Sequence, residues 1–379
     1  MEEFKLKLFI LKVKGRCNIN CSYCYEYNLA DQSWKDKPAT MSLTIVEQAA
    51  KRIGQHVLKH GLEIITIVFH GGEPLLLPPE WFVQACQIFS DHLPSGVKIL
   101  YGLQSNGMLL DEAYLEVLCR LNIKVGISLD GTRESNDKFR VDFKGRSTFE
   151  RTLNGITLLS QPKYESINSG ILTVIDPFSD PIRTFDFLSS LRPKHIDFLY
   201  PHYHHDGPPP FPVGAISTWL CTVFDQWWDT DSDIRIRLFE DMLHLMLGGT
   251  YSVEHLGLAP IELLVIQTDG AYEAVDSLKS TFEGAVFTGK NVMKDEFDTV
   301  LENELIKSRI DRAASLCASC KACEWNQVCG GGYIPHRYSE ANGFDNPSIY
   351  CADLKLFFSH IRTKLENFAP EIRQLVPAS

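Results

Sequence analysis

The chain has 379 residues, of which 44% are hydrophobic and 22% are charged, the proportions of a soluble globular protein. Its formal net charge of -11 leaves no excess of Lys and Arg to neutralise phosphates, so a nucleic-acid partner is not expected. No stretch approaches the roughly 20 apolar residues needed to span a bilayer. The N-terminus is charged and alternating, unlike a signal peptide. The composition therefore predicts a cytoplasmic protein without a membrane partner.

Short apolar runs alternate with longer amphipathic stretches from residue 4 to about residue 200. The expected strands are 4–13, 64–69, 97–103, 124–129, 170–175 and 195–200, and the expected helices are 42–59, 80–92, 111–121, 147–160 and 181–190. Strands that alternate with helices form βαβ units with a parallel sheet. Six such units predict an α/β fold of the incomplete-barrel type.

The pattern changes after Tyr200, where a loop rich in His, Gly and Pro covers residues 202–212. Beyond it the expected elements are helices at 214–229, 234–247 and 353–367 and a β-hairpin at 261–275. The segment 317–351 has little periodicity and many Cys, Gly and aromatic residues. Such a segment is more easily held together by a metal than by an apolar core.

Three of the 11 cysteines lie in one short loop directly after the first expected strand. Cys17, Cys21 and Cys24 have the spacing C-x3-C-x2-C. Three thiolates from one loop can hold three irons of a [4Fe–4S] cluster and leave the fourth iron open to another ligand. The alternative is a structural zinc loop, but zinc would need a fourth Cys or His nearby, and none occurs between residues 25 and 55.

The loop CNINCSYCY resembles the signature of radical S-adenosylmethionine (SAM) enzymes, whose fold is a partial (β/α)6 TIM-like barrel. HGGEP at 70–74, SNG at 105–107, SLDG at 128–131 and TVI at 173–175 follow in the family's order. The resemblance implies SAM bound at the open iron, with a pocket formed by Tyr23, Gly71, Gly72, Glu73, Pro74, Ser105, Asn106, Ser128, Asp130, Arg140 and Val174. Arg133 and Arg146 are alternatives to Arg140 as the partner of the SAM carboxylate.

Five further cysteines gather at positions 317, 320, 323, 329 and 351. They resemble the SPASM extension of radical SAM enzymes that modify peptides, but Val275 and Tyr333 stand where two cysteines of the full pattern belong. The resemblance implies one auxiliary [4Fe–4S] cluster, held by Cys320, Cys323, Cys329 and Cys351. Cys317 is either an alternative ligand or a buried thiol, and zinc is the alternative for the whole region. The implied domains are a barrel at 1–210, a helical bridge at 211–260 and a SPASM-like domain at 261–379.

Three stretches narrow the resemblance: ADQSW at 30–34, HGGEPLL at 70–76 and CGGGYIPHRYS with GFDNPSIYCADL within 329–354. They resemble maturases of ribosomally synthesised peptides that join an aromatic ring carbon to a β-carbon, forming a cyclophane. This implies cleavage of SAM to a 5′-deoxyadenosyl radical, which abstracts a side-chain hydrogen, at Cβ, from a precursor peptide. An electron donor such as flavodoxin or ferredoxin is implied as a partner. No separate leader-recognition domain is expected, because the first strand begins near residue 4.

Ring closure onto an aromatic carbon would need a base, and the candidates are His202, His204, His205, Asp206, Asp269 and Asp276. A second enzymatic hypothesis is a sulfatase-type maturase that oxidises Cys or Ser to formylglycine, or a thioether-forming maturase. The depleted set of auxiliary cysteines counts against both. A non-catalytic iron–sulfur or zinc protein that binds peptides is the hypothesis from another class.

Overall fold

The computed structural model describes residues 4–230 and 233–369, which divide into two compact units. The first unit combines the chain up to Leu172 with Leu191–Pro193 and Glu262–Lys307. The second unit combines Thr173–Ser190, Lys194–Ile261 and the chain from Ser308 onward. The ends of the expected outer domains, residues 1–3 and 370–379, lie outside the described residues. No described helix is both long and apolar enough to cross a membrane.

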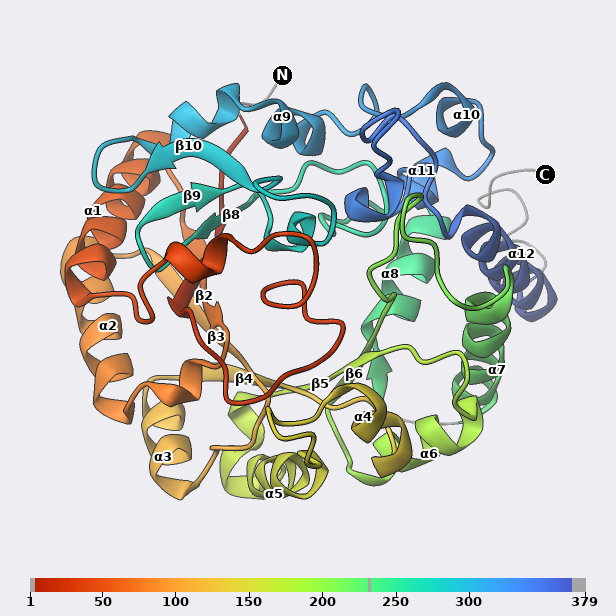
Figure 1. The fold of residues 1–379 in the computed structure, drawn as a ribbon, viewed down its shortest axis with the longest axis horizontal. Coiled ribbons are helices and arrows are strands. Elements are labelled where there is room, and N and C mark those ends of the chain that lie inside the picture. Colours follow the sequence, from red (N-terminus) through yellow and green to blue (C-terminus); the bar gives the residue numbers. More distant parts are fainter. Residues whose placement is uncertain (1–3, 231–232, 370–379) are drawn as a thin grey trace. The chain divides into compact units, whose positions relative to one another are not determined.

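A mainly parallel sheet forms the centre of the first unit, with the strand order β10-β9-β8-β1-β2-β3-β4-β5 (Figure 1). These strands are β1 (Leu8–Lys14), β2 (Ile64–Gly71), β3 (Lys98–Ser105), β4 (Ile123–Ser128), β5 (Asn168–Val174), β8 (Leu263–Ile266), β9 (Ala271–Glu273) and β10 (Phe287–Asn291). Neighbours from β8 through β5 pair in parallel, and β9 and β10 pair antiparallel. The last residues of β5 belong to the second unit.

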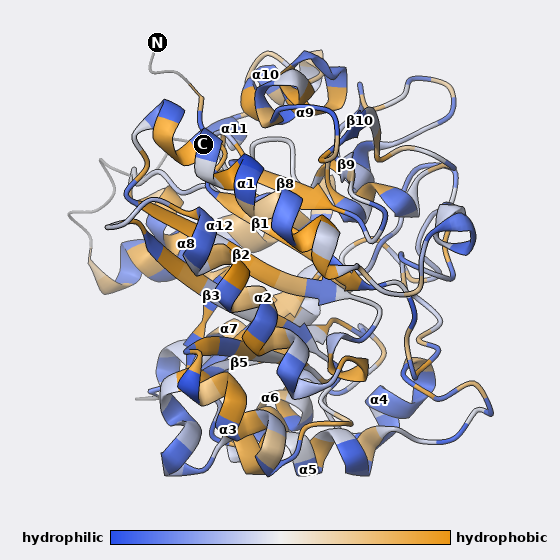
Figure 2. Cartoon of the chain, turned by 90° about the vertical axis from the view of Figure 1, so that its left-hand side faces the viewer, coloured by the Kyte–Doolittle hydropathy of each residue, from blue (hydrophilic) through white to orange (hydrophobic). Residues whose placement is uncertain are grey.

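The helices of the first unit are α1 (Leu43–His60), α2 (Pro79–His92), α3 (Glu112–Arg120), α4 (Arg133–Phe139) and α5 (Phe149–Leu159). Helices α1, α2 and α3 lie outside β2, β3 and β4 in Figure 1. The Ser42 side chain caps the N-terminus of α1 by accepting a hydrogen bond from the Ile45 N–H, and Gly61, at φ 60°, ends that helix. Figure 2 shows β1, β2 and β8 as mainly apolar strands, as expected for a sheet covered by helices.

The second unit contains the parallel pair β6 (His195–Leu199) and β7 (Arg235–Ile236). Its helices are α6 (Pro181–Ser190), α7 (Ala215–Asp229), α8 (Arg237–Met246), α10 (Ala318–Lys321), α11 (Asn326–Cys329) and α12 (Cys351–Phe368), and α9 (Glu304–Ile310) spans the boundary between the units. Phe224 of α7 packs against Phe239 of α8 and Phe357 of α12, with ring centroids 5.2 and 5.9 Å away. An aromatic core therefore holds α7, α8 and α12 together.

The expected strands and helices of the α/β region are all present, with ends displaced by a few residues. The largest displacement is at β1, which begins at Leu8 and not at residue 4. Six further elements are not predicted by the hydrophobic pattern of the sequence: α4, α9, β7, β10 and the short helices α10 and α11. Helix α4 reads RESNDKF, which has no apolar period, and β10 reads FTGKN, which has no alternation of buried positions. Elements without hydrophobic periodicity leave no such signal in the sequence.

Candidate cluster and SAM site

The cysteine loop of the first unit follows β1, as the sequence predicts. The Cys24 N–H donates to the Cys21 carbonyl at 3.0 Å, and the Asn28 N–H donates to the Cys24 carbonyl at 2.8 Å. The thiols of Cys17, Cys21 and Cys24 lie near enough to interact electrostatically with one another. Burial raises the pKa of all three thiols, that of Cys17 to about 12. A metal that replaces their protons would therefore relieve the cost of ionising buried thiols.

The described cysteines do not form a preformed tetrahedral zinc site. Tetrahedral zinc with Zn–S bonds of about 2.3 Å places its sulfurs about 3.8 Å apart. Among the cysteines, all of which the structure describes, no three sulfur atoms lie within 4.8 Å of one another. A cubane cluster holds its thiolates farther apart than a single ion does. The three thiols of the cysteine loop thus interact with one another without forming a ready zinc site.

Gly71 and Gly72 allow the end of β2 to approach the cysteine loop closely. A Cβ on Gly71 would lie 2.3 Å from the Lys14 carbonyl oxygen. One on Gly72 would lie 2.1 Å from the Tyr27 hydroxyl and 2.2 Å from the Arg16 carbonyl oxygen. Gly71 also has φ 131°, a backbone conformation that favours glycine. Both glycines are therefore required for the end of β2 to pack against the segment that contains Lys14, Arg16 and Tyr27. This requirement holds with or without a ligand.

Glu73 connects the HGGEP motif to the SNG motif. Its fully buried carboxylate accepts from the Asn106 N–H at 2.8 Å and from the Ser105 hydroxyl at 2.8 Å. It also accepts from the Leu75 N–H at 3.0 Å. Pro74 follows it as the buried first residue of a short 3-10 turn. The turns after β2 and β3 are thus fixed by one side chain.

Asn106 in turn contacts the cysteine loop. Its side-chain amide donates to Asn18 Oδ1 at 2.7 Å, and the same nitrogen lies 3.9 Å from the Cys17 sulfur. Three segments that are far apart in the sequence, around residues 17, 73 and 106, therefore meet at the carboxyl ends of β1, β2 and β3. Ligand sites of parallel α/β folds lie at this edge of the sheet.

Tyr23, Asp130 and Arg140 form a second buried group at the same edge. The Tyr23 hydroxyl donates to Asp130 Oδ2 at 2.5 Å and accepts from Arg140 Nη1 at 3.0 Å. Arg140 also interacts electrostatically with the Cys21 thiol. The two alternative arginines lie elsewhere: Arg133 pairs with Glu150, and Arg146 pairs with Asp142 at 2.6 Å, both with exposed guanidinium groups. Arg140 alone of the three is buried beside the cysteine loop.

Two further residues of the expected pocket, Ser128 and Val174, lie at the ends of strands. The Ser128 hydroxyl at the end of β4 accepts from Gln104 Nε2 at 2.9 Å. Val174 lies at the end of β5, in the second unit.

A buried ionic network lies beside this site in the first unit, and Asp276 is its one member that the sequence offered as a candidate base. Lys12 Nζ contacts Glu26 Oε1 and Asp276 Oδ2 and lies 3.0 Å from His70 Nδ1. The network continues through Lys279 to Glu26 at 2.9 Å and Glu273 at 3.3 Å, and through Lys37 to Glu273 at 2.7 Å. The available signal was Lys12, a charged residue in the otherwise apolar strand LFILKVK.

The protonation states of this network follow from its geometry. An ammonium only donates, so His70 Nδ1 accepts from Lys12, and burial together with this cation lowers the pKa of His70 to about 4. Burial alone would raise the pKa of Asp276, but the Lys12 ammonium outweighs it and holds that pKa below its usual value. Tyr25 of the cysteine loop also donates to Asp276 Oδ2, at 3.1 Å. Asp276 is therefore ionised at neutral pH and attached to the cysteine loop.

The other candidate bases have local structural roles. Asp269 Oδ1 accepts from the Ala271 N–H at 3.0 Å and shapes the hairpin turn. In the second unit, Asp206 accepts from the Glu340 N–H at 2.6 Å, and His205 Nε2 lies 2.8 Å from the Pro347 carbonyl oxygen. His204 and His202 pack against Tyr338 and Tyr333, with ring centroids 5.4 and 5.7 Å apart.

The C-terminal cysteines converge within the second unit. Cys317 precedes α10, Cys320 lies in α10, Cys329 ends α11 and Cys351 begins α12, with Cys323 between the short helices. Cys320 interacts electrostatically with Cys317, Cys329 and Cys351, and Cys323 with Cys329. Burial raises the pKa of Cys320 and Cys329 to about 12. Burial acts likewise on Cys317, but hydrogen bonds from Ser319 and Cys320 lower its pKa overall.

The parallel α/β fold and the three thiols after β1 define a radical SAM domain, and residues 11–188 match the family model of the Radical SAM superfamily. The chain carries this domain, and its cofactors are SAM and [4Fe–4S] clusters, including an auxiliary cluster. Over nearly its whole length it is homologous to anaerobic sulfatase-maturating enzymes.

One such relative is the cysteine-type anaerobic sulfatase-maturating enzyme of Clostridium novyi, 25% identical, with 95% of this chain and 96% of the relative covered. The serine-type enzyme of Bacteroides thetaiotaomicron is 24% identical, with 99% and 94% covered. A structure of native anSMEcpe with bound AdoMet superposes with a TM-score of 0.81 at 24% identity, over 96% of this chain and 99% of that one. That likeness confirms the expected fold. Among the enzymatic hypotheses, the comparisons favour the sulfatase-type maturase over the cyclophane-forming group.

Proposed function

We propose that this protein is a cysteine-type maturase, which oxidises a Cys side chain of a peptide or protein substrate to formylglycine. The observation that carries the proposal is homology to cysteine-type anaerobic sulfatase-maturating enzymes over 95% or more of the chain. A related structure holds both AdoMet and the Cp18Cys peptide, which supports a peptide as the substrate. The proposed domains are a barrel at 1–210, a helical bridge at 211–260 and a SPASM-like domain at 261–379. A flavodoxin or ferredoxin is the proposed electron donor.

The residues proposed to hold the cofactors are those that the structure brings together in each unit. Cys17, Cys21 and Cys24 would hold the SAM-binding cluster, and Cys320, Cys323, Cys329 and Cys351 the auxiliary one. Arg140 is the proposed partner of the SAM carboxylate, because the other two arginines have exposed guanidinium groups that pair with Glu150 and Asp142. With both cofactors bound, the site supplies an oxidant strong enough to remove a hydrogen atom from an unactivated carbon.

Asp276 is the proposed proton acceptor. Conversion of a CH2–SH group to an aldehyde removes two electrons and two protons, and water then replaces sulfur, which leaves as hydrogen sulfide. The SAM-derived oxidant would take one hydrogen atom, and an auxiliary cluster held by Cys320, Cys323, Cys329 and Cys351 would accept the second electron, so one proton remains for a base. Asp276 is ionised, buried and hydrogen-bonded to Tyr25 of the cysteine loop, whereas Asp269 and Asp206 hold backbone turns. Tyr25 and Lys12 therefore position the carboxylate.

The test is an anaerobic assay of the reduced, cluster-loaded protein with SAM and the Cp18Cys peptide. We expect 5′-deoxyadenosine and an aldehyde that reacts with a hydrazine reagent. Asp276→Asn should lower aldehyde formation by about 10²–10⁴-fold, the usual effect of losing a general base, while SAM cleavage continues. Asp269→Asn, in the same segment but outside the ionic network, is the matched control. Absence of aldehyde from the parent with both Cys and Ser forms of the peptide would exclude this function.

Cyclophane formation is the second candidate, and one observation favours it. The positions of two missing auxiliary ligands are occupied by other packed groups: Val275 is buried, and the Tyr333 hydroxyl bonds Glu254 Oε2 at 3.2 Å. A second auxiliary cluster cannot be ligated there, which sets this chain apart from the full SPASM pattern. Iron analysis should therefore give about eight irons per chain, from two cubane clusters. A crosslinked product would be recognised by loss of two hydrogens from an aromatic-containing peptide without aldehyde.

A further inference from the structure

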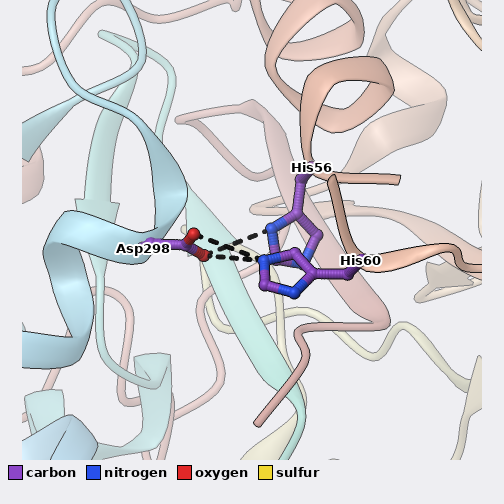
Figure 3. A group of neighbouring side chains, drawn as sticks. All are labelled: His56, His60 and Asp298. Carbon is purple, nitrogen blue, oxygen red and sulfur yellow. Dashed lines mark hydrogen bonds and ion pairs between the residues drawn. The ribbon is translucent and has the colours of Figure 1, made fainter. Parts of the chain in front are cut away.

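Two histidines and an aspartate of the first unit face one another away from the cysteine loop. His56 and His60 lie one turn apart at the C-terminal end of α1, and Asp298 projects toward them from the 3-10 turn Phe297–Glu302 (Figure 3). His56 contacts Leu6, which precedes β1, whereas Cys17 follows β1. At about 3.3 Å per residue, this strand separates the two places by about 20 Å. The group is therefore not part of the cluster and SAM site.

The distances within the group match those between ligands of a small tetrahedral cation. His56 Nδ1 lies 3.4 Å from Asp298 Oδ1, and His60 Nε2 lies 3.3 Å from the same oxygen. All three ligand atoms are within 4.8 Å of one another. With zinc–nitrogen and zinc–oxygen bonds of about 2.0–2.1 Å, the edge of a tetrahedron is about 3.3 Å. Two edges of the triangle already have this length.

The tautomer of His56 explains why a cation suits this place. His56 Nε2 lies 3.1 Å from the Leu6 carbonyl oxygen, which can only accept, so this nitrogen carries a proton. In the neutral ring, Nδ1 then directs its lone pair at the Asp298 carboxylate, and two acceptors face each other. A cation between them removes this conflict. Metal-bound histidines usually donate their other N–H to a carbonyl or carboxylate in this way.

Protonation of both rings is a poor alternative to a bound ion. The imidazole centroids are 4.4 Å apart, and the side chains are only 4% and 1% exposed. Two imidazolium ions so close together and so shielded from water would repel each other. A single divalent cation instead takes two neutral imidazoles and one carboxylate.

We propose that His56, His60 and Asp298 bind one first-row divalent cation, with zinc the favoured ion. His56 Nδ1, His60 Nε2 and Asp298 Oδ1 are the ligands, and Lys59, which contacts Asp298 Oδ2, orients the carboxylate. A cavity of about 160 Å³, lined by His56, Asp298 and residues that include Arg52, Gln55 and Glu296, has room for water as a fourth ligand. The ion would fasten the end of α1 to the segment that carries Asp298, independently of the proposed function.

The test uses the anaerobically purified, cluster-loaded protein, so that iron already fills the cysteine sites. After equilibration with zinc and gel filtration, we expect one tightly bound zinc per chain. Its X-ray absorption should show nitrogen and oxygen neighbours at about 2.0–2.1 Å and no sulfur shell near about 2.3 Å. Zinc should also raise the thermal unfolding temperature, because only the folded chain forms the site.

Three variants complete the experiment. His60→Gln and Asp298→Asn should each lower zinc affinity by more than the roughly 10–100-fold typical of outer-shell changes, and abolish the thermal shift. His92→Gln, on the neighbouring helix α2 and 3.6 Å from Glu47, is the matched control and should bind like the parent. Asp298→Asn keeps the shape of the side chain, so it separates lost binding from lost folding. A sulfur shell, no zinc in the parent, or as much zinc in both variants as in the parent would overturn the proposal.

Discussion

The carboxylate of Glu73 accepts a hydrogen bond from the Asn106 N–H at 2.8 Å, and Asn106 contacts Asn18 of the cysteine loop. This pair joins the turn after β2 to the turn after β3. The cysteine loop, the HGGEP motif and the SNG motif are therefore one connected structure, and a substitution in one of them will disturb the other two.

Replacement of Glu73 should both destabilise the protein and weaken SAM binding. Glu73→Ala leaves the buried N–H groups of Asn106 and Leu75 without their acceptor, at about 1–3 kcal/mol each. We expect a lower urea midpoint and incomplete cluster loading, measured by unfolding and by iron content. The exposed Glu47→Ala is the control and should change stability by less than about 0.5 kcal/mol. Equal midpoints for the two variants would contradict the central role of Glu73.

Arg140→Lys should weaken SAM binding more than Arg146→Lys does. The Arg140 guanidinium is buried beside Tyr23 and Cys21, and a lysine does not reproduce its planar set of donors. Loss of one charge-assisted hydrogen bond, worth about 1.5–3 kcal/mol, corresponds to roughly 10–100-fold in the SAM dissociation constant. Equilibrium dialysis of the cluster-loaded protein measures it. Similar affinities for both variants would exclude Arg140 as the partner of the SAM carboxylate.

Gly72→Ala should prevent assembly of the cysteine loop. The added methyl group would lie 2.1 Å from the Tyr27 hydroxyl and 2.2 Å from a backbone oxygen that cannot move freely. We expect a cost of about 1–3 kcal/mol or more from overpacking, and loss of the iron–sulfur absorption of the first cluster. Gly102→Ala in β3 is the comparison, because its methyl group would meet Val68 at an ordinary 3.4 Å. Normal cluster loading of Gly72→Ala would show that the loop tolerates a shift.

Stability should fall as the pH drops below about 6.5. Burial, with Arg237 and Arg312, lowers the pKa of His255 to about 3, and burial lowers that of His70 to about 4. The unfolded chain binds these protons near the ordinary pKa of 6.5 and the folded chain does not, so acid favours unfolding. Asp241, 3.9 Å from His255 Nε2, opposes this because burial raises its pKa to about 6.

Among these three groups, the lowered pKa values of the two histidines outweigh the raised pKa of the carboxyl group. We expect a net loss of about 1–2 kcal/mol between about pH 7 and pH 5, measured as a falling urea midpoint. His255→Asn removes one titrating group and should make the midpoint less dependent on pH. A midpoint that rises between pH 7 and pH 5 would contradict this assignment.

The sequence by itself determined the fold class and the cofactor chemistry. Alternation of apolar runs with amphipathic stretches predicts βαβ units, because hydrophobic period follows secondary structure. The spacing of Cys17, Cys21 and Cys24 predicts three ligands in one loop, because that relationship is local. Helix α4 and strand β10 have no such local pattern, so the sequence does not predict them. The resemblance to the cyclophane group rested on the residues of three short stretches. Similarity over nearly the whole chain favours the sulfatase-type maturases instead.

Only the tertiary structure decided which distant residues meet. Lys12 pairs with Asp276 and His60 with Asp298, although more than two hundred residues separate the members of each pair. Their contact depends on parallel pairing of β1 with β8 and on the return of the segment Glu262–Lys307 to the first unit. Spacing along the chain encodes local geometry, but such pairings arise from packing of the complete fold, and no local pattern in the sequence records them.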